Sequence, residues 1–152
     1  EVALDPATGA LRIARYVVAE DCGTVLNPIV VRGQQQGAIA MGLSGALFEE
    51  VVYDANGQNL SATLGDYMIA TATETPDIEI LALHTPNRRT PVGIKGMAEG
   101  GVMGDIGALA NAVNDALAPF GVVADQMPLS PQRLRDLLRG ASPSYPGKAT
   151  EE

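Results

Sequence analysis

The stretch "NPIVVRGQQQGAIAMGLSGALFEE", residues 27–50, decides how this chain folds. Asn27 is a favourable N-cap, and Pro28 suits the first helical position because its ring fixes φ and its missing N–H is not needed there. The pattern therefore predicts a helix over residues 28–50. Apolar side chains lie almost all round this helix, which is typical of a helix that is buried on every side.

Glycine is unusually frequent in the predicted helix, at Gly33, Gly37, Gly42 and Gly45. Each glycine in an exposed helix interior costs roughly 1 kcal/mol relative to alanine. A helix that keeps so many glycines is expected to lie close to another backbone or to a bound molecule.

Shorter elements are predicted on both sides of this helix. Residues 2–4 and 11–20 form a hairpin whose turn uses Asp5, Pro6 and Gly9. Further strands are predicted at residues 51–55, 77–85 and 122–127, with a turn at residues 56–57 and a short helix or irregular link at residues 64–71. An amphipathic helix is predicted at residues 105–117, and a short helix follows the N-cap Ser130.

These elements predict an α+β fold of mixed strands with two main helices and no regular βαβ series. Residues 1–139 are interpreted as one domain segment, and residues 140–152 as a disordered tail. The chain opens on Glu1 rather than on methionine, so we expect it to be part of a longer polypeptide.

Composition excludes several classes of function. The formal net charge of −8 argues against a nucleic-acid partner, because phosphate binding requires a basic face. Cys22 is the one cysteine and His84 the one histidine, so the chain has no disulfide framework and no metal ligand set of its own is predicted. No apolar run approaches the length of a membrane span and no signal-peptide pattern opens the chain, so we expect a cytoplasmic protein.

A second stretch, "VGIKGMAEGGVMGD" at residues 92–105, places the lone carboxylate of Glu99 among four glycines just before a predicted helix. Free N–H groups at a helix start favour negative charge. An ionised carboxylate in an apolar bend is a candidate general base, and its glycine neighbours let a substrate or cofactor approach the backbone. The alternative is an ordinary solvated helix cap.

Three motifs occur in order along the chain: "DCGTVLNPIVVRGQQQGAIAMGLSGALFEE", "GDYMI" and "GIKGMAEGG". Together they resemble the C-terminal part of the molybdenum-binding large subunit of the xanthine oxidase family. That family includes aldehyde oxidoreductases, aerobic carbon monoxide dehydrogenases and N-heterocycle hydroxylases. The resemblance extends over residues 2–138, and it implies the C-terminal portion of the molybdopterin-binding domain.

The resemblance implies a catalytic role for Glu99, which matches the glutamate of the family's "KGxGE" loop. It would take a proton from a hydroxyl group on molybdenum, whose oxygen then attacks an electrophilic carbon. Ala98 stands where glycine is commoner in that loop. Lys95, Gly96 and Gly100 are implied to border the cofactor, with Lys95 either near a cofactor phosphate or simply solvated.

The glycine-rich helix resembles the family's "GQxxGGxxQG" segment, whose second glutamine contacts the pterin. Gln34 matches the first glutamine, whereas Met41 stands at the position of the second. Methionine cannot donate an amide hydrogen bond. Either the cofactor contact is made in another way at Met41, or Met41 is a core residue.

The resemblance also implies cofactors and partners. The cofactor would be molybdenum-molybdopterin, with its dinucleotide form left open, and iron–sulfur clusters and FAD would reside on partner subunits or domains. The upstream part of the molybdenum subunit would complete the pocket. The implied activity is oxidation of a small aldehyde, N-heterocycle or carbon monoxide with water-derived oxygen, and the isolated chain is expected to be inactive. The alternative is a non-catalytic assembly module or an isolated fragment of such a subunit.

Overall fold

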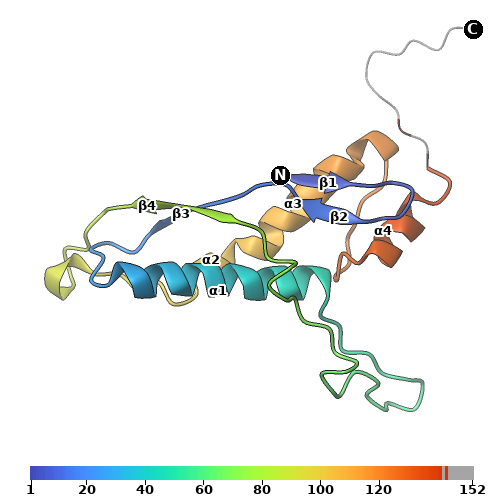
Figure 1. The fold of residues 1–152 in the computed structure, drawn as a ribbon, viewed down its shortest axis with the longest axis horizontal. Helices are drawn as coiled ribbons and strands as arrows, with labels where there is room; N and C mark the ends of the chain where they lie inside the picture. The colour runs from blue at the N-terminus through green and yellow to red at the C-terminus, as the bar shows by residue number, and fades with distance from the viewer. Residues whose placement is uncertain (142, 144–152) are drawn as a thin grey trace, which may run out of the picture.

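The computed structural model describes residues 1–141 and 143. Its helices and strands give the α+β class that the sequence predicts, and Figure 1 shows α1 running beneath β3 and β4 with α2 and α3 beside it. The elements in chain order are β1 (Val2–Leu4), β2 (Leu11–Ile13), β3 (Tyr16–Asp21), α1 (Pro28–Leu47), β4 (Ile78–Leu83), η1 (Pro91–Gly93), α2 (Gly100–Met103), α3 (Asp105–Leu117), η2 (Ala118–Phe120) and α4 (Pro131–Leu138).

The three longest helices are confirmed, and side-chain caps explain where two of them begin. The Asn27 side chain accepts hydrogen bonds from the N–H groups of Ile29 and Val30, and Pro28 takes the first position of α1. Ser130 caps α4 in the same way. Helix α1 ends at Leu47, three residues before the predicted end.

The strand predicted at residues 11–20 is divided between two sheets. Its first part, β2, forms the predicted hairpin with β1. The Ala14 N–H then donates to the Glu1 carbonyl oxygen at 2.9 Å, and the chain turns away from the hairpin. Strand β3 pairs in parallel with β4, in a register that runs from Tyr16 opposite Ile78 to Asp21 opposite Leu83. Since α1 lies in the crossover, the fold contains one β-α-β unit that the sequence did not predict.

The strand predicted at residues 122–127 is wrong. The Asn114 side chain accepts from the Ala124 N–H at 2.8 Å and donates to the Ala124 carbonyl at 3.1 Å. A side chain thus satisfies the backbone groups that a neighbouring strand would otherwise need to pair.

The strand predicted at residues 51–55 is also wrong, although its turn is present. One isolated bridge joins Tyr53 to Asn59, and Gly57 has the positive φ of 81° that the turn requires. The segment around this turn extends away from the helices as an arm (Figure 1). The link at residues 64–71 is irregular rather than helical. Of the predicted tail, residues 142 and 144–152 lie outside the described part.

The core lies where α1, α3 and α4 meet, and the Leu129 N–H fastens the last segment to the Ala46 carbonyl of α1 at 2.7 Å. Its buried members are all aliphatic: Ile39, Leu43, Ala46, Leu109, Val113, Leu117, Ala124, Leu129, Leu134 and Leu138.

One carboxylate is buried at the edge of this core. Asp105, the first residue of α3, is 1% exposed and accepts a hydrogen bond from the Tyr16 hydroxyl at 2.5 Å. Its Oδ2 has no hydrogen-bond partner among the described residues and lies against Gly42 of α1, where a Cβ would be only 2.1 Å away. Burial raises the pKa of Asp105 above its ordinary value of 3.8, and the Tyr16 hydrogen bond opposes this only in part.

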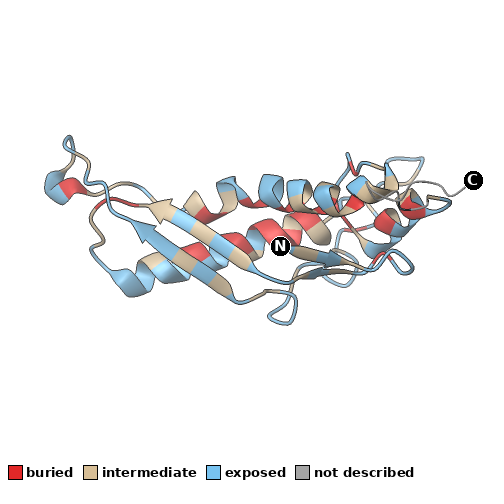
Figure 2. Ribbon diagram, turned by 90° about the horizontal axis from the view of Figure 1, so that it is seen from above, coloured by how far each residue is buried: buried red, intermediate tan, exposed pale blue. Residues whose placement is uncertain are grey.

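Helix α1 is not buried on every side within the described part of the chain, as expected for a chain too small to cover such a helix alone. Ile29 is 85% exposed, Val30 56% and Met41 57%. No residue of β3 or β4 is fully buried, as Figure 2 shows by the absence of buried colour on both strands. A groove of about 310 Å³ also separates the start of α1 from β4. None of the described helices is long and apolar enough to cross a bilayer.

We expect the isolated chain to self-associate, because exposed apolar side chains favour removal from water. Light scattering and the fluorescence of a hydrophobic dye measure this. The variant Ile29→Gln should bind less dye, whereas Ile39→Gln, which alters a residue with 0% exposure, should instead unfold the chain. A monodisperse monomer that binds no dye would contradict the expectation.

Asp105→Asn should stabilise the protein at neutral pH but not in acid. The folded chain holds the Asp105 proton more tightly than the unfolded chain, so this group lowers the free energy of unfolding as the pH rises above about 3.8. Asparagine keeps the acceptor for Tyr16 and removes the charge. The thermal midpoints of parent and variant should therefore diverge between pH 4 and pH 7. A variant less stable than the parent at pH 7 would show that the ionised carboxylate is favourably paired.

Candidate functional site

Glu99 lies at the start of α2 without capping it. Its backbone has φ −121° and ψ 9°, and its side chain makes no cap hydrogen bond. Glu99 is exposed, and its carboxylate has no hydrogen-bond partner within the described residues. The carboxylate is therefore available to an external group, and the choice between a general base and an ordinary solvated residue at a helix start stays a prediction.

The loop that leads to Glu99 has a strained backbone. Val92 and Gly93 have φ values of 52° and 78°, in the left-handed region that a β-branched residue rarely adopts. The Gly93 carbonyl accepts backbone hydrogen bonds from Thr24 at 3.1 Å and from Asn87 at 3.0 Å. These bonds compensate for strain of roughly 1–3 kcal/mol, and they fix the direction in which the chain enters the loop.

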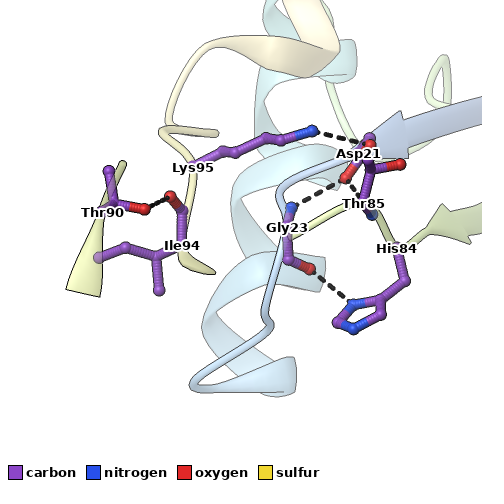
Figure 3. A network of polar contacts seen from close by, with 7 residues as sticks. All are labelled: Asp21, Gly23, His84, Thr85, Thr90, Ile94 and Lys95. Carbon is purple, nitrogen blue, oxygen red and sulfur yellow. Dashed lines mark hydrogen bonds and ion pairs between the residues drawn. The ribbon is translucent and has the colours of Figure 1, made fainter. Parts of the chain in front are cut away.

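Asp21, at the end of β3, joins three segments in the network of Figure 3. Its Oδ1 accepts from the N–H groups of Gly23 at 2.9 Å and Thr85 at 3.1 Å, and its Oδ2 accepts from the Lys95 ammonium at 2.9 Å. The hydrogen bond from Lys95, followed by those from Thr85 and Gly23, holds the pKa of Asp21 well below its usual 3.8. An ionised Asp21 therefore ties the Lys95 end of the loop to both strands.

The one cysteine and the one histidine of the chain both have structural contacts here. The Cys22 thiol side chain is buried, and the Cys22 carbonyl accepts from the Lys95 N–H at 3.0 Å. The His84 Nδ1 lies 2.9 Å from the Gly23 carbonyl oxygen (Figure 3). Both contacts hold the same junction between strand end and loop.

Gln34 and Met41 are both exposed on α1, seven residues apart and therefore on one face of the helix. The interpretation of Met41 as a core residue is wrong within the described part of the chain. A Cβ at Gly33 or Gly37 would meet nothing within 4 Å, so no other described segment packs against this part of the helix surface. Gly101 of α2 packs against Gln35 and Ala38 of α1. Because adjacent residues of a helix are about 100° apart, this contact lies next to the face that carries Gln34 and Met41.

A hollow of about 250 Å³ lies between the loop and the first turns of α1. Its lining includes Val30, which is one helical turn before Gln34, and Lys95 and Met97 from the loop. The hollow and the open face of α1 thus form one surface.

The three predicted cofactor-binding residues of the loop differ in how much free space surrounds them. A Cβ at Gly96 would meet nothing within 4 Å, whereas the Lys95 ammonium is paired with Asp21. The space beside Gly100 is filled by the side chain of Glu20, with a Cβ position only 1.6 Å from its Oε1. A cofactor contact at Gln34, Met41, Lys95, Gly96 and Gly100 stays a prediction. In the described part of the chain, no group of three or more His, Cys, Asp or Glu side chains is arranged to hold a metal ion.

Sequence reasoning missed Glu20, Asp21 and Gln35. One signal was available: the alternation of β3 places Tyr16, Val18 and Glu20 on the same face. A carboxylate on an otherwise apolar inner face requires a partner, which the structure supplies from Gln35.

A family model described as "Molybdopterin cofactor-binding domain" matches residues 1–76. The chain belongs to this family. The match includes Gln34 and Met41 and ends before the Glu99 loop.

The relatives support the same family over most of the chain. The nicotine 6-hydroxylase large subunit of Paenarthrobacter nicotinovorans is 41% identical over 140 residues, which are 91% of this chain and 17% of that protein. The carbon monoxide dehydrogenase large chain of Hydrogenophaga pseudoflava is 38% identical over 133 residues, 88% of this chain and 17% of that one. The crystal structure of quinoline 2-oxidoreductase from Pseudomonas putida 86 is similar with a TM-score of 0.88 and 42% identity, covering 93% of this chain and 18% of the other.

The chain therefore spans about a sixth of the length of these relatives. The similarity confirms the predicted fold class and the predicted membership of the molybdenum hydroxylases.

The described residues fit one side of a pterin cofactor. A pterin is flat and carries hydrogen-bonding groups at its edge. The open glycine face of α1 offers a flat surface, and the exposed Gln34 amide has both donors and an acceptor. The 250 Å³ hollow is smaller than a typical ligand pocket of about 300–1,000 Å³, so these residues form one wall rather than an enclosure.

Asp21→Asn should destabilise the protein at neutral pH and flatten its dependence on acid. Because the pKa of Asp21 is depressed on folding, its contribution is present above about pH 3.8 and is lost as the pH falls through the folded value. Thermal midpoints from pH 3 to pH 7 would measure this, with Asp115→Asn on the exposed side of α3 as the control. A parallel pH dependence in Asp21→Asn and the parent would contradict the role of the network.

Proposed function

We propose that this chain forms part of the active site of a molybdenum hydroxylase, to which it contributes Glu99 as the general base. The observation that carries the proposal is the exposed carboxylate of Glu99, which has no partner among the described residues and sits on a loop fixed by Asp21 and Gly93. The lining of the hollow beside that loop includes Val30, which lies one helical turn before Gln34 on α1. The family membership supplies the cofactor that such a surface would meet.

Bound molybdenum-molybdopterin would supply the two-electron oxidation, for which the described side chains have no redox group. Glu99 would accept a proton at a carboxylate oxygen from the water-derived nucleophile, as that nucleophile attacks an electrophilic carbon. The proposed cofactor contacts are a hydrogen bond from the Gln34 amide, packing by Met41, and close backbone approach at Gly96. At Gly100 the contact would be to backbone atoms away from Glu20, because Glu20 fills the side where a Cβ would lie. Lys95 would act on a cofactor phosphate only from its ion pair with Asp21.

The substrate would be a small molecule. Two of the relatives are named for nicotine and quinoline, which are N-heterocycles, and one for carbon monoxide. N-heterocycles are therefore the first substrates to test, followed by carbon monoxide and aldehydes.

Electron transfer would require groups that one cysteine cannot hold. We infer iron–sulfur and flavin partners, together with the remaining part of the molybdenum subunit, as the surroundings of this segment. The cytoplasmic location and the dinucleotide form of the cofactor stay predictions.

A non-catalytic assembly module is the alternative. The exposed apolar side chains Ile29, Val30 and Met41 of α1 favour a role in assembly, since other protein would remove them from water. The two functions differ in one respect: an assembly module would tolerate the loss of the Glu99 carboxylate.

Glu99→Gln in the complete enzyme tests the proposal. Glutamine keeps the size of the side chain and removes its basicity, so reduction of the enzyme by substrate should slow by at least about 10²-fold. Bleaching of the enzyme by substrate without an external acceptor measures this step. Molybdenum and pterin content should remain near that of the parent, because Glu99 is not proposed as a ligand.

Glu79→Gln is the matched control, because Glu79 is an exposed glutamate on β4 that pairs with Arg15. It should bleach at the parent rate. If Glu99→Gln also bleaches at the parent rate, Glu99 is not the base. If its molybdenum content collapses instead, Glu99 has a structural role.

A further inference from the structure

The turn that carries Glu99 packs against a partly buried polar pair. Glu20 projects from the inner face of β3, and Gln35 of α1 donates its Nε2 hydrogen to Glu20 Oε2 at 2.9 Å. Gln35 is only 3% exposed. A buried amide is costly unless it is hydrogen-bonded, so this pair holds the Glu20 side chain in one orientation.

Glu20 fills the space in which residue 100 would carry a side chain. A Cβ on Gly100 would lie 1.6 Å from Glu20 Oε1, 2.4 Å from Cδ and 3.0 Å from Oε2. The three nearest atoms thus all belong to Glu20. Gly100 is not among the glycines with positive φ, so its backbone would accept alanine. The requirement for glycine at this position is a steric one, and it comes from Glu20.

The next residue makes a second close contact with the same part of α1. A Cβ on Gly101 would lie 2.9 Å from the Gln35 carbonyl oxygen and 3.0 Å from the Ala38 Cβ. Both residues that follow Glu99 therefore meet the Glu20–Gln35 pair, while the Glu99 side chain itself points to the exposed surface.

We propose that Glu20, oriented by Gln35, is a positioning residue that sets where the Glu99 carboxylate lies. The inference rests on the proposed function of Glu99. The Glu20 side chain limits by steric contact how closely the Gly100 backbone can approach β3. Displacement of that side chain would shift the turn and move the base relative to the reacting carbon. A catalytic group displaced by about 1 Å can cost up to 10²-fold in rate.

The test is a rescue experiment in the complete enzyme. Gly100→Ala alone should lower the limiting rate of bleaching by substrate about tenfold or more, because its methyl group collides with Glu20. Glu20→Ala alone should also lower it, because this steric contact is lost. The double variant Glu20→Ala/Gly100→Ala should recover to within about threefold of the parent, because the methyl group occupies the vacated space.

The conservative variant separates position from charge. Glu20→Gln keeps the length of the side chain and an acceptor oxygen for Gln35, so it should bleach at nearly the parent rate. In all variants the substrate concentration at half-maximal rate and the molybdenum and pterin content should change little. Gly107→Ala is the control for a glycine substitution in the next helix, where a Cβ meets nothing within 4 Å.

Each failure has a distinct signature. If Glu99→Gln is slow but Gly100→Ala and Glu20→Ala are as fast as the parent, the positioning role is wrong and the proposed base stands. If Glu20→Gln is as slow as Glu20→Ala, the charge of Glu20 acts rather than its position, and the proposal is overturned. An unimpaired Glu99→Gln overturns both proposals. If Gly100→Ala fails to load cofactor, the comparison of Glu20→Gln with Glu20→Ala decides.

Discussion

The closeness of α1 to the segment that follows Glu99 is the constraint on which the rest of the structure depends. At Gly101 the two backbones leave no room for a Cβ, and at Gly42 the Asp105 carboxylate occupies the place of a side chain. Because interiors are close-packed, such contacts tolerate little displacement. Two glycines, one on each side of the interface, therefore determine where α2 and α3 start, and so determine where Glu99 emerges.

This closeness brings polar groups into the interface between strand, helix and loop. Glu20 and Gln35 satisfy each other there, whereas Asp105 is paired through only one of its oxygens within the described structure. Buried polar groups cost stability when unpaired but have few alternative arrangements when paired. The interface is consequently less stable than an aliphatic one of the same size and more specific in its geometry, which suits the positioning role that we propose for it.

The sequence predicted those features that depend on neighbouring residues. Asn27, Pro28 and Ser130 mark helix starts through local hydrogen bonds, and the periodicity of residues 105–117 follows from a single buried face. The pairing of β3 with β4, and the capture of Ala124 by Asn114, join residues far apart in the chain or replace a strand by a side chain. Glu99 could be predicted because it lies in a local glycine-rich motif. Glu20 and Gln35 could not be predicted, because they come close to the Glu99 turn only in the folded chain.

The candidate site is exposed to water in this chain, as are parts of α1 and of the sheet beside it. Electrostatic catalysis is effective where water is excluded, yet Glu99, Gln34 and Met41 are all exposed in this chain. The chain spans about a sixth of its relatives' length, and the exposed apolar side chains Ile29, Val30 and Met41 of α1 are stabilised when other protein covers them. The cover that buries α1 would also close the hollow beside Lys95 and remove water from Glu99. If Glu99 is the base, as we propose, the covering of α1 and the completion of the active site are one process at this surface.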